Sequence, residues 1–269
     1  MHKNRIWLID FLKAFSLMSF LQVLVLSLVQ GLTEFLPVSS SGHLVIFQKF
    51  FGLARPPVLF DILLHLGSLG AIVVYFGKDL WEIAIRKEKR GLIWLIVLGT
   101  IPAGIVGSLF DKQIEAVFDS LKGVGLGFIF TAVLLFSTKF IKNKSRQFNQ
   151  LKWQDAITIG FFQAIAIFPG ISRSGSTIAS GLSRGLSAEA AFNFSFYLAV
   201  PAILGAFVIK AGDLTSYSFN ETALGLIGMV ISGIISYLSL RFLEKTLKSD
   251  RLCWFGIYTL ILGIAILLV

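Results

Sequence analysis

Six long apolar runs restrict the fold of this chain more than any other feature of its sequence. Each is close to the ~20 residues that an α-helix needs to cross the hydrocarbon core of a bilayer. With 55% hydrophobic residues, 14% charged residues and a mean hydropathy of +0.82, the chain is far from a soluble average. A transmembrane barrel would instead alternate apolar and polar residues in short strands. We therefore predict a polytopic α-helical membrane protein with spans at 58–76, 91–110, 123–141, 188–209, 224–242 and 252–269.

Two polar segments interrupt the apolar sequence and resemble each other. Residues 30–44 read QGLTEFLPVSSSGHL, and residues 163–177 read QAIAIFPGISRSGST at a constant offset of 133. The alignment pairs Gln30 with Gln163, Ser39 with Ser172, Ser41 with Ser174 and Gly42 with Gly175. It also pairs Glu34 with Ile167, Ser40 with Arg173 and His43 with Ser176. One copy therefore carries the acid and the imidazole, and the other carries the cation.

Each polar segment follows an apolar run that stops at a proline. The run 15–36 ends at Pro37 and the run 153–168 ends at Pro169, and a second, shorter helix is expected at 43–51 and again from Ser174. Such pairs predict re-entrant hairpins, whose irregular backbone is tolerated at membrane depth where it lines a cavity. We expect one membrane domain over 1–269, with a first repeat at about 14–141 and a second at about 153–269.

A hairpin plus three spans gives an odd number of crossings, so the two halves are expected to have inverted topology. Fifteen of the 24 Lys and Arg residues lie in 78–90, 139–152, at 184 and in 241–251, which this topology places on one face. That face is predicted to be cytoplasmic, with both termini and the site opening outward. The alternative is that the four arms of the two hairpins also span, which gives ten crossings. The halves would then be parallel, and segment 139–152 would lie on the other side of the membrane from segment 78–90. Residues 1–13 are expected to be an amphipathic interfacial lead-in or a disordered tail.

The net charge of +9 does not indicate nucleic-acid binding, because the basic residues lie in short segments between apolar runs. The single cysteine, Cys253, excludes a disulfide framework and a CxxC metal pattern. The oligomeric state is left open by the sequence, a homodimer included.

The two breaks predict an anion site, because each ends at a helix N-terminus with free N–H groups and a favourable dipole. Arg173 adds a forked donor suited to phosphate. Glu34 and His43 lie on opposite arms of the first break and indicate proton-transfer or metal chemistry. Gln30 precedes Glu34 by one helical turn, so both are candidate ligands of Mg²⁺ or Ca²⁺.

Structural roles are also open for these residues. Glu34 and Arg173 can form a purely structural ion pair, and Ser39 and Ser41 can be helix caps. His65, inside a plain apolar span, is expected to be a packing residue without a functional role. Asp61 is expected at the interface.

The motifs QGLTEFLPVSSSGH and PGISRSGST resemble the two signatures of the bacterial undecaprenyl-diphosphate phosphatases, the bacitracin-resistance phosphatases. The resemblance spans nearly the whole chain and implies hydrolysis of the C55 polyprenyl diphosphate to the monophosphate, which recycles the lipid carrier of peptidoglycan synthesis in the plasma membrane. It implies functional residues in both motifs, namely Gln30, Glu34, Ser40, His43, Ser172, Arg173 and Thr177. The family often has Glu where this chain has Gln30.

We therefore expect Glu34, Ser40, His43 and Arg173 to be catalytic. The expected phosphate-binding residues are Ser39, Ser172, Arg173, Ser174 and Thr177. Ser40, three residues before His43, is a candidate nucleophile activated by the imidazole, and a directly attacking water is the competing nucleophile. A transporter or flippase of a phosphorylated polyprenyl lipid is the alternative function.

Overall fold

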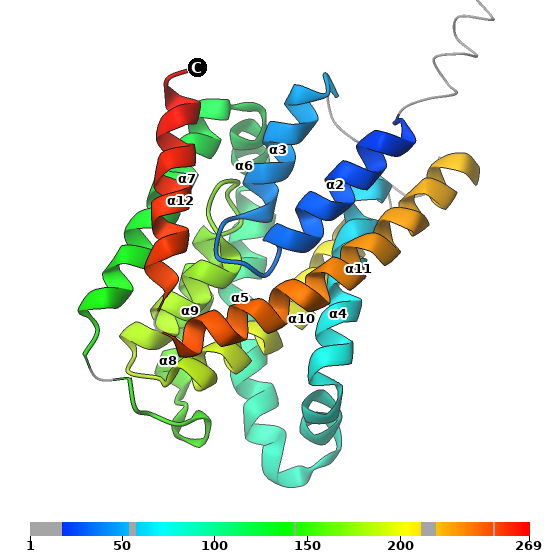
Figure 1. Ribbon diagram of the computed structural model, residues 1–269. Coiled ribbons are helices and arrows are strands. Elements are labelled where there is room, and N and C mark those ends of the chain that lie inside the picture. Colours follow the sequence, from blue (N-terminus) through cyan, green and yellow to red (C-terminus); the bar gives the residue numbers. More distant parts are fainter. Residues whose placement is uncertain (1–17, 54–57, 143, 211–218, 250) are drawn as a thin grey trace, which may run out of the picture.

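The computed structural model describes residues 18–53, 58–142, 144–210, 219–249 and 251–269. The proposed lead-in at 1–13 lies outside these ranges. Within them the chain is helical, with one isolated β-bridge between Arg146 and Leu186 and no strand. The longer helices are α4 (Val58–Ile85), α5 (Arg90–Leu109), α7 (Leu121–Ser137), α10 (Ala188–Lys210), α11 (Phe219–Lys248) and α12 (Leu252–Leu267) (Figure 1).

Five of the six expected spans are long and apolar enough to cross a membrane, among the described residues. They lie at Leu59–Ile85, Lys87–Leu109, Leu121–Phe140, Ala188–Ile209 and Glu221–Lys248. The sixth run forms α12, which is apolar but has only 16 residues. Helices α4 and α11 extend beyond the expected 58–76 and 224–242, because good helix formers continue past the apolar stretch into the charged segments.

The two hairpins are present as pairs of short helices. The first pair is α2 (Phe20–Thr33) and α3 (Ser40–Phe50), and the second is α8 (Trp153–Ile165) and α9 (Arg173–Ser183). We call residues 34–39 the first break and residues 166–172 the second break. Helix α2 starts later than the expected residue 15, because Ser19 and Gln22 form a capping box there.

The 133-residue offset extends from the motifs to the order of the helices. Helices α3 and α9 are displaced by that offset at both ends, and α2, α4, α5 and α7 correspond in order to α8, α10, α11 and α12. The packing follows the same correspondence, because α2 lies along α11 while α8 lies along α5. The short helix α6 (Asp111–Asp119) was not predicted and has no counterpart among the described residues of the second half.

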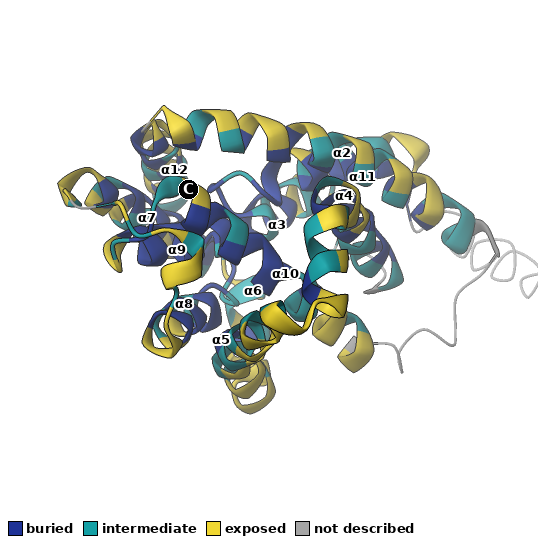
Figure 2. Cartoon of the chain, turned by 90° about the horizontal axis from the view of Figure 1, so that it is seen from below, coloured by how far each residue is buried: buried dark blue, intermediate teal, exposed yellow. Residues whose placement is uncertain are grey.

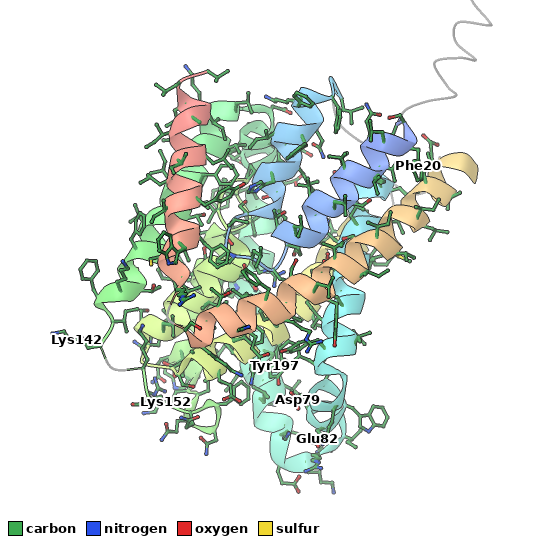
Figure 3. The ribbon with its side chains drawn as sticks, viewed as in Figure 1. Phe20, Asp79, Glu82, Lys142, Lys152 and Tyr197 are labelled. Carbon is green, nitrogen blue, oxygen red and sulfur yellow. The ribbon has the colours of Figure 1, made fainter. Side chains whose placement is uncertain are left out.

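The two most basic segments lie at the same end of the molecule. The ring of Phe148, from segment 139–152, packs edge-on against Tyr197 with centroids 5.6 Å apart, and the Tyr197 hydroxyl donates to Asp79. Figure 3 shows Lys142, Lys152, Asp79 and Glu82 at one end and Phe20 at the other. The charge count predicts that these segments share a face of the membrane, and the inverted topology of the halves stays a prediction.

Buried residues gather at the centre and exposed apolar residues on the outer sides of the peripheral helices (Figure 2). The main core cluster joins residues of α4, α8, α9, α10 and α11, and it includes Phe35 of the first break. Phe35 packs edge-on against Phe196 of α10, with centroids 5.2 Å apart. Because this core holds the break by an aromatic side chain, the adjacent Glu34 is fixed in position.

A buried carboxylate fastens the second hairpin at the basic end. Asp155 of α8 is fully buried and accepts hydrogen bonds from Arg146, from Arg184 and from the backbone N–H of Lys152. Burial by itself would raise the pKa of Asp155, but these hydrogen bonds and charges hold it below its usual value. The loop before α8 and the end of α9 are thereby joined.

Candidate functional site

The two hairpins touch each other through small and cyclic residues, with the start of each short helix against the break of the other hairpin. A Cβ on Gly42 would lie 2.9 Å from the Cα of Gly170, and one on Gly175 would lie 3.2 Å from the Cβ of Pro37. In the 133-residue alignment Gly42 pairs with Gly175 and Pro37 with Gly170, so each half makes the same contact on the other. Reciprocal contacts of this kind are characteristic of a twofold arrangement. The approach leaves no room for a side chain at Gly42 and little room for one at Gly175.

Both short helices after the breaks begin with the same serine cap. Ser39 Oγ accepts from the N–H of Gly42 at 3.3 Å, and Ser172 Oγ accepts from the N–H of Gly175 at 3.1 Å. The expected capping role of Ser39 is thereby confirmed. Ser39 also has φ of 67°, the only positive φ at a non-glycine residue among those described. Strained backbone of this kind is common at functional sites.

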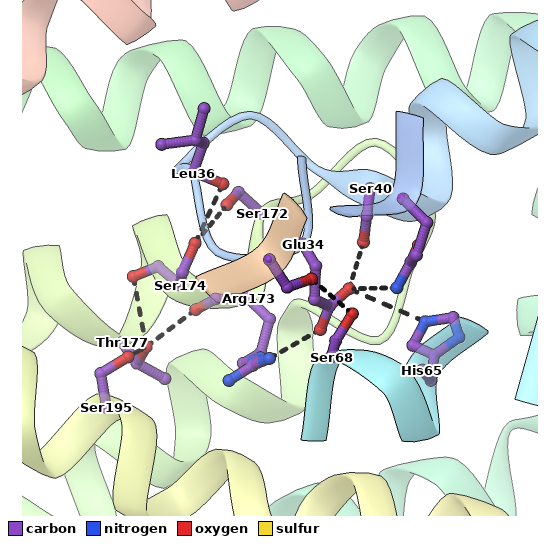
Figure 4. A network of polar contacts seen from close by, with 12 residues as sticks. Glu34, Leu36, Ser40, His65, Ser68, Ser172, Arg173, Ser174, Thr177 and Ser195 are labelled. Carbon is purple, nitrogen blue, oxygen red and sulfur yellow. Dashed lines mark hydrogen bonds and ion pairs between the residues drawn. The ribbon is translucent and has the colours of Figure 1, made fainter. Parts of the chain in front are cut away.

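Glu34 is the centre of a polar network drawn from both halves (Figure 4). Its Oε1 accepts from Arg173 Nη2 at 2.7 Å. Its Oε2 accepts from Ser40 Oγ at 2.6 Å and from Gln30 Nε2 at 3.0 Å. Ser40 and Arg173 are aligned residues at the starts of α3 and α9, and both bind the same carboxylate. The structural ion pair between Glu34 and Arg173 is therefore present.

Arg173 has one occupied and one unoccupied terminal nitrogen. Nη2 binds Glu34, whereas Nη1 is buried and has no hydrogen-bond partner. A buried guanidinium nitrogen without a partner is costly, and it is satisfied when an acceptor binds there. Arg173 is also the first residue of α9, where backbone N–H groups and the helix dipole favour an anion. The site therefore contains a buried donor without a partner next to a helix N-terminus, a combination suited to an anion such as phosphate.

His43 lies apart from Ser40, contrary to the expectation that these two side chains meet. Its Nδ1 bonds the backbone carbonyl of Ser39 at 2.7 Å, and its Nε2 bonds the hydroxyl of Tyr258 at 2.7 Å. The Ser40 hydroxyl bonds Glu34 instead, because the break folds back and brings the carboxylate over the start of α3. If Ser40 is the nucleophile, the base beside it is Glu34.

Three of the expected phosphate-binding hydroxyls are engaged by the protein itself. Ser174 Oγ donates to the carbonyl of Leu36, and Thr177 Oγ1 bonds the carbonyl of Arg173 and the hydroxyl of Ser195. Ser172 is an N-cap. These residues position Arg173 and the second break, and they offer phosphate no free hydroxyl in this conformation.

His65 of α4 lies at the site, although the sequence gives it no functional role. Its Nε2 lies 3.7 Å from Glu34 Oε2, and its side chain is 35% exposed. The expectation that His65 only packs in a plain span is inconsistent with this position. Its Nδ1 bonds the carbonyl of Asp61 four residues earlier, which aims Nε2 at the carboxylate. Only the tertiary contact between α4 and the first break brings it there.

Gln30 is fully buried, and its Oε1 has no hydrogen-bond partner. Together with Glu34 it offers one amide and one carboxylate oxygen. No group of three or more His, Cys, Asp or Glu residues suited to a metal occurs in the described part of the chain. Gln30 Nε2, not Oε1, faces Glu34 here, so the two oxygens could share a hard cation such as Mg²⁺ only after the amide turns over, with the remaining ligands from substrate phosphates and water.

An all-helical fold with five spanning-length helices and a buried Glu–Arg–Ser site at two touching helix breaks defines a multi-pass membrane protein. A family model described as "Bacitracin resistance protein BacA" matches residues 23–265, and the chain belongs to this family.

Several curated relatives are similar over nearly their whole length. A protein of Carboxydothermus hydrogenoformans named undecaprenyl-diphosphatase is 41% identical, with 93% of this chain and 97% of that protein covered. A Stutzerimonas stutzeri protein named undecaprenyl-diphosphatase 2 is also 41% identical, with coverages of 94% and 98%. One from Halothermothrix orenii, named undecaprenyl-diphosphatase, is 37% identical, with coverages of 93% and 98%.

Proposed function

We propose that this protein is an undecaprenyl-diphosphate phosphatase, which hydrolyses C55 polyprenyl diphosphate to the monophosphate and inorganic phosphate. The names of the relatives and the family membership support this function. The observation in the molecule that carries it is Arg173, whose Nη1 is buried and unpaired beside a carboxylate and a serine hydroxyl. A buried cation with a free donor suits a diphosphate, and the neighbouring acid suits its hydrolysis.

In this proposal the terminal phosphate of the substrate binds at the start of α9. Nη1 of Arg173 and the free N–H groups of the helix hold its oxygens and stabilise the charge that spreads over them in the transition state. Nη2 stays on Glu34, so one guanidinium orients both the phosphate and the base.

The nucleophile in this proposal is the Ser40 hydroxyl. Glu34 Oε2, 2.6 Å away, takes its proton as the Ser40 oxygen bonds to phosphorus. The bridging P–O bond breaks and the lipid monophosphate leaves. A water then attacks the phosphoserine and releases inorganic phosphate, with the imidazole of His43 as the base. The competing mechanism is direct attack by water activated at Glu34.

A divalent cation, Mg²⁺ or Ca²⁺, remains a proposal, with Glu34 and Gln30 as the residues that would hold it. Such an ion would neutralise charge on the diphosphate. Gln30→Ala should then raise the Mg²⁺ concentration needed for half-maximal turnover. An unchanged Mg²⁺ titration would exclude Gln30 as a ligand.

We also propose that the protein lies in the bacterial plasma membrane, with the breaks entering from the outer face and the site opening outward. The arrangement of the basic segments at one end of the molecule supports this orientation. The homodimer is likewise a proposal.

One experiment on the purified protein distinguishes a phosphatase from the alternative function, a lipid transporter. In detergent micelles no second leaflet exists, so a phosphatase still releases one inorganic phosphate per polyprenyl diphosphate. The wild type should release phosphate, and Glu34→Gln should lose about 10²-fold or more of the rate. No phosphate from wild type, with lipid movement in vesicles, would favour the transporter.

A further inference from the structure

The ring of His43 is held from the opposite half of the molecule by Tyr258 of α12. The two rings are stacked, with centroids 5.7 Å apart and an interplanar angle of 6°, and Phe128 packs edge-on against the imidazole at 5.2 Å. His43 is only 5% exposed, whereas Tyr258 is 48% exposed. The Tyr258 side chain therefore lies between the buried imidazole and the exposed surface of the protein.

The hydrogen bonds define which nitrogen of His43 carries the proton in the neutral ring. The carbonyl oxygen of Ser39 can only accept, so Nδ1, which lies 2.7 Å from it, carries the hydrogen. Nε2 is then the acceptor, and the Tyr258 hydroxyl donates to it at 2.7 Å. The basic lone pair of the imidazole therefore points at Tyr258.

The second half has no equivalent pair. In the 133-residue alignment His43 corresponds to Ser176, and Tyr258 corresponds to Gly125. The Ser176 hydroxyl is buried without a partner. Because a packing requirement of the repeat would recur in both halves, the pair belongs to the chemistry of the first break.

We infer that Tyr258 is a positioning residue for the reaction, acting through His43; this inference rests on the proposed function. The stacked ring fixes the plane of the imidazole. The hydroxyl keeps Nε2 unprotonated, which is the form in which the imidazole can act as a base.

Kinetics test the inference with two variants. Tyr258→Phe keeps the stacking and loses the hydroxyl, and Tyr258→Leu loses both. We expect kcat to fall about fivefold in the first and about 10²-fold in the second, with KM unchanged in both. In the His43→Gln background neither change should lower kcat further. The inference would be overturned if a Tyr258 change lowered kcat by the same factor in the His43→Gln background as in wild type. It would also be overturned if both Tyr258 variants had normal kcat.

A spectroscopic measurement separates this inference from the proposed function, because it needs no turnover. In detergent, ¹⁵N spectra of histidine-labelled protein should give one protonated and one unprotonated nitrogen for His43, assigned with His43→Gln. Tyr258→Phe should shift the Nε2 signal, and the control Tyr197→Phe, which removes a hydroxyl bonded to Asp79, should not. If the Nε2 signal is unchanged in Tyr258→Phe, the contact is refuted even when the enzyme releases phosphate. If the signal shifts but wild type releases no phosphate, only the proposed function is refuted.

Discussion

At the scale of single residues, the site depends on how Glu34 shares its two oxygens. Oε1 faces Arg173 of the second half, and Oε2 faces Ser40 and Gln30 of the first. The carboxylate is thus neutralised by a guanidinium while remaining in contact with a hydroxyl. A buried acid in this position can accept the proton of Ser40 without being left as an uncompensated charge.

Replacing Ser40 by Ala tests whether this hydroxyl attacks phosphorus. We expect Ser40→Ala to bind substrate but to lose turnover, and wild-type enzyme quenched during turnover to carry phosphate on Ser40 in a peptide map. Ser41→Ala is the matched control, because its hydroxyl contacts Ser39 instead of Glu34. If Ser40→Ala kept a tenth of the wild-type rate, a loss of only ~1.4 kcal/mol of barrier, water would be the nucleophile.

The residues of the site could be predicted to different degrees from the sequence. Glu34, Ser40 and Arg173 stand out because charged and hydroxyl groups are costly in apolar runs, and their contact follows from the aligned breaks. His65 and Tyr258 do not, since each lies in an ordinary span and reaches the site only through helix packing. The same reason explains the error about His43: helical spacing alone brings it near Ser40, whereas the fold of the break turns Ser40 toward Glu34.

At the scale of elements, the second hairpin is fastened by the carboxylate of Asp155 between Arg146 and Arg184. Asp155→Asn should lower stability by about 2–3 kcal/mol near neutral pH, because it leaves two arginines without their shared partner while water still screens them partly. The loss is measurable as a lower midpoint of thermal unfolding in detergent. Thr158→Ala, a change at a partly exposed residue of the same helix, should have little effect.

The pH dependence of this effect has a defined sign. The folded pKa of Asp155 is lowered, so its contribution is full above the unfolded pKa and is lost as pH falls through the folded value. The stability difference between wild type and Asp155→Asn should therefore shrink on acidification. A difference that stays constant down to pH 3 would show that the carboxylate charge does not fasten the hairpin.

Element boundaries were predictable where the local sequence contains the signal. The breaks follow from Pro37 and Pro169, and the start of α9 follows from its serine cap. Helix α6 was missed because its nine residues are amphipathic, with neither a spanning length nor an apolar run. The extension of α4 to Ile85 was missed because periodicity in a charged segment is weak.

At the scale of the whole molecule, the inverted arrangement of the halves remains a prediction that labelling can test. In a Cys253→Ala background, Lys144→Cys should react with an impermeant thiol reagent only from the cytoplasmic side. Lys122→Cys, at the exposed start of α7, should react only from outside. Reaction of both from one side would contradict the inverted topology. Asp213, in the segment that the inverted topology also places outside, lies beyond the described residues, so Lys122 is the labelling position used for the outer side.

The central claim is that the two breaks together form one diphosphate-hydrolysing site, and Arg173 tests it most directly because it comes from the second half. Lysine keeps the charge of Arg173 but has a single nitrogen, which cannot bind Glu34 and a phosphate oxygen in the same fixed geometry. The measurement is release of inorganic phosphate from polyprenyl diphosphate by purified, folded wild type, Arg173→Lys and the surface control Arg86→Lys. We predict normal release by wild type and Arg86→Lys and a loss of about 10²-fold or more in Arg173→Lys. Near-normal release by Arg173→Lys would contradict the account.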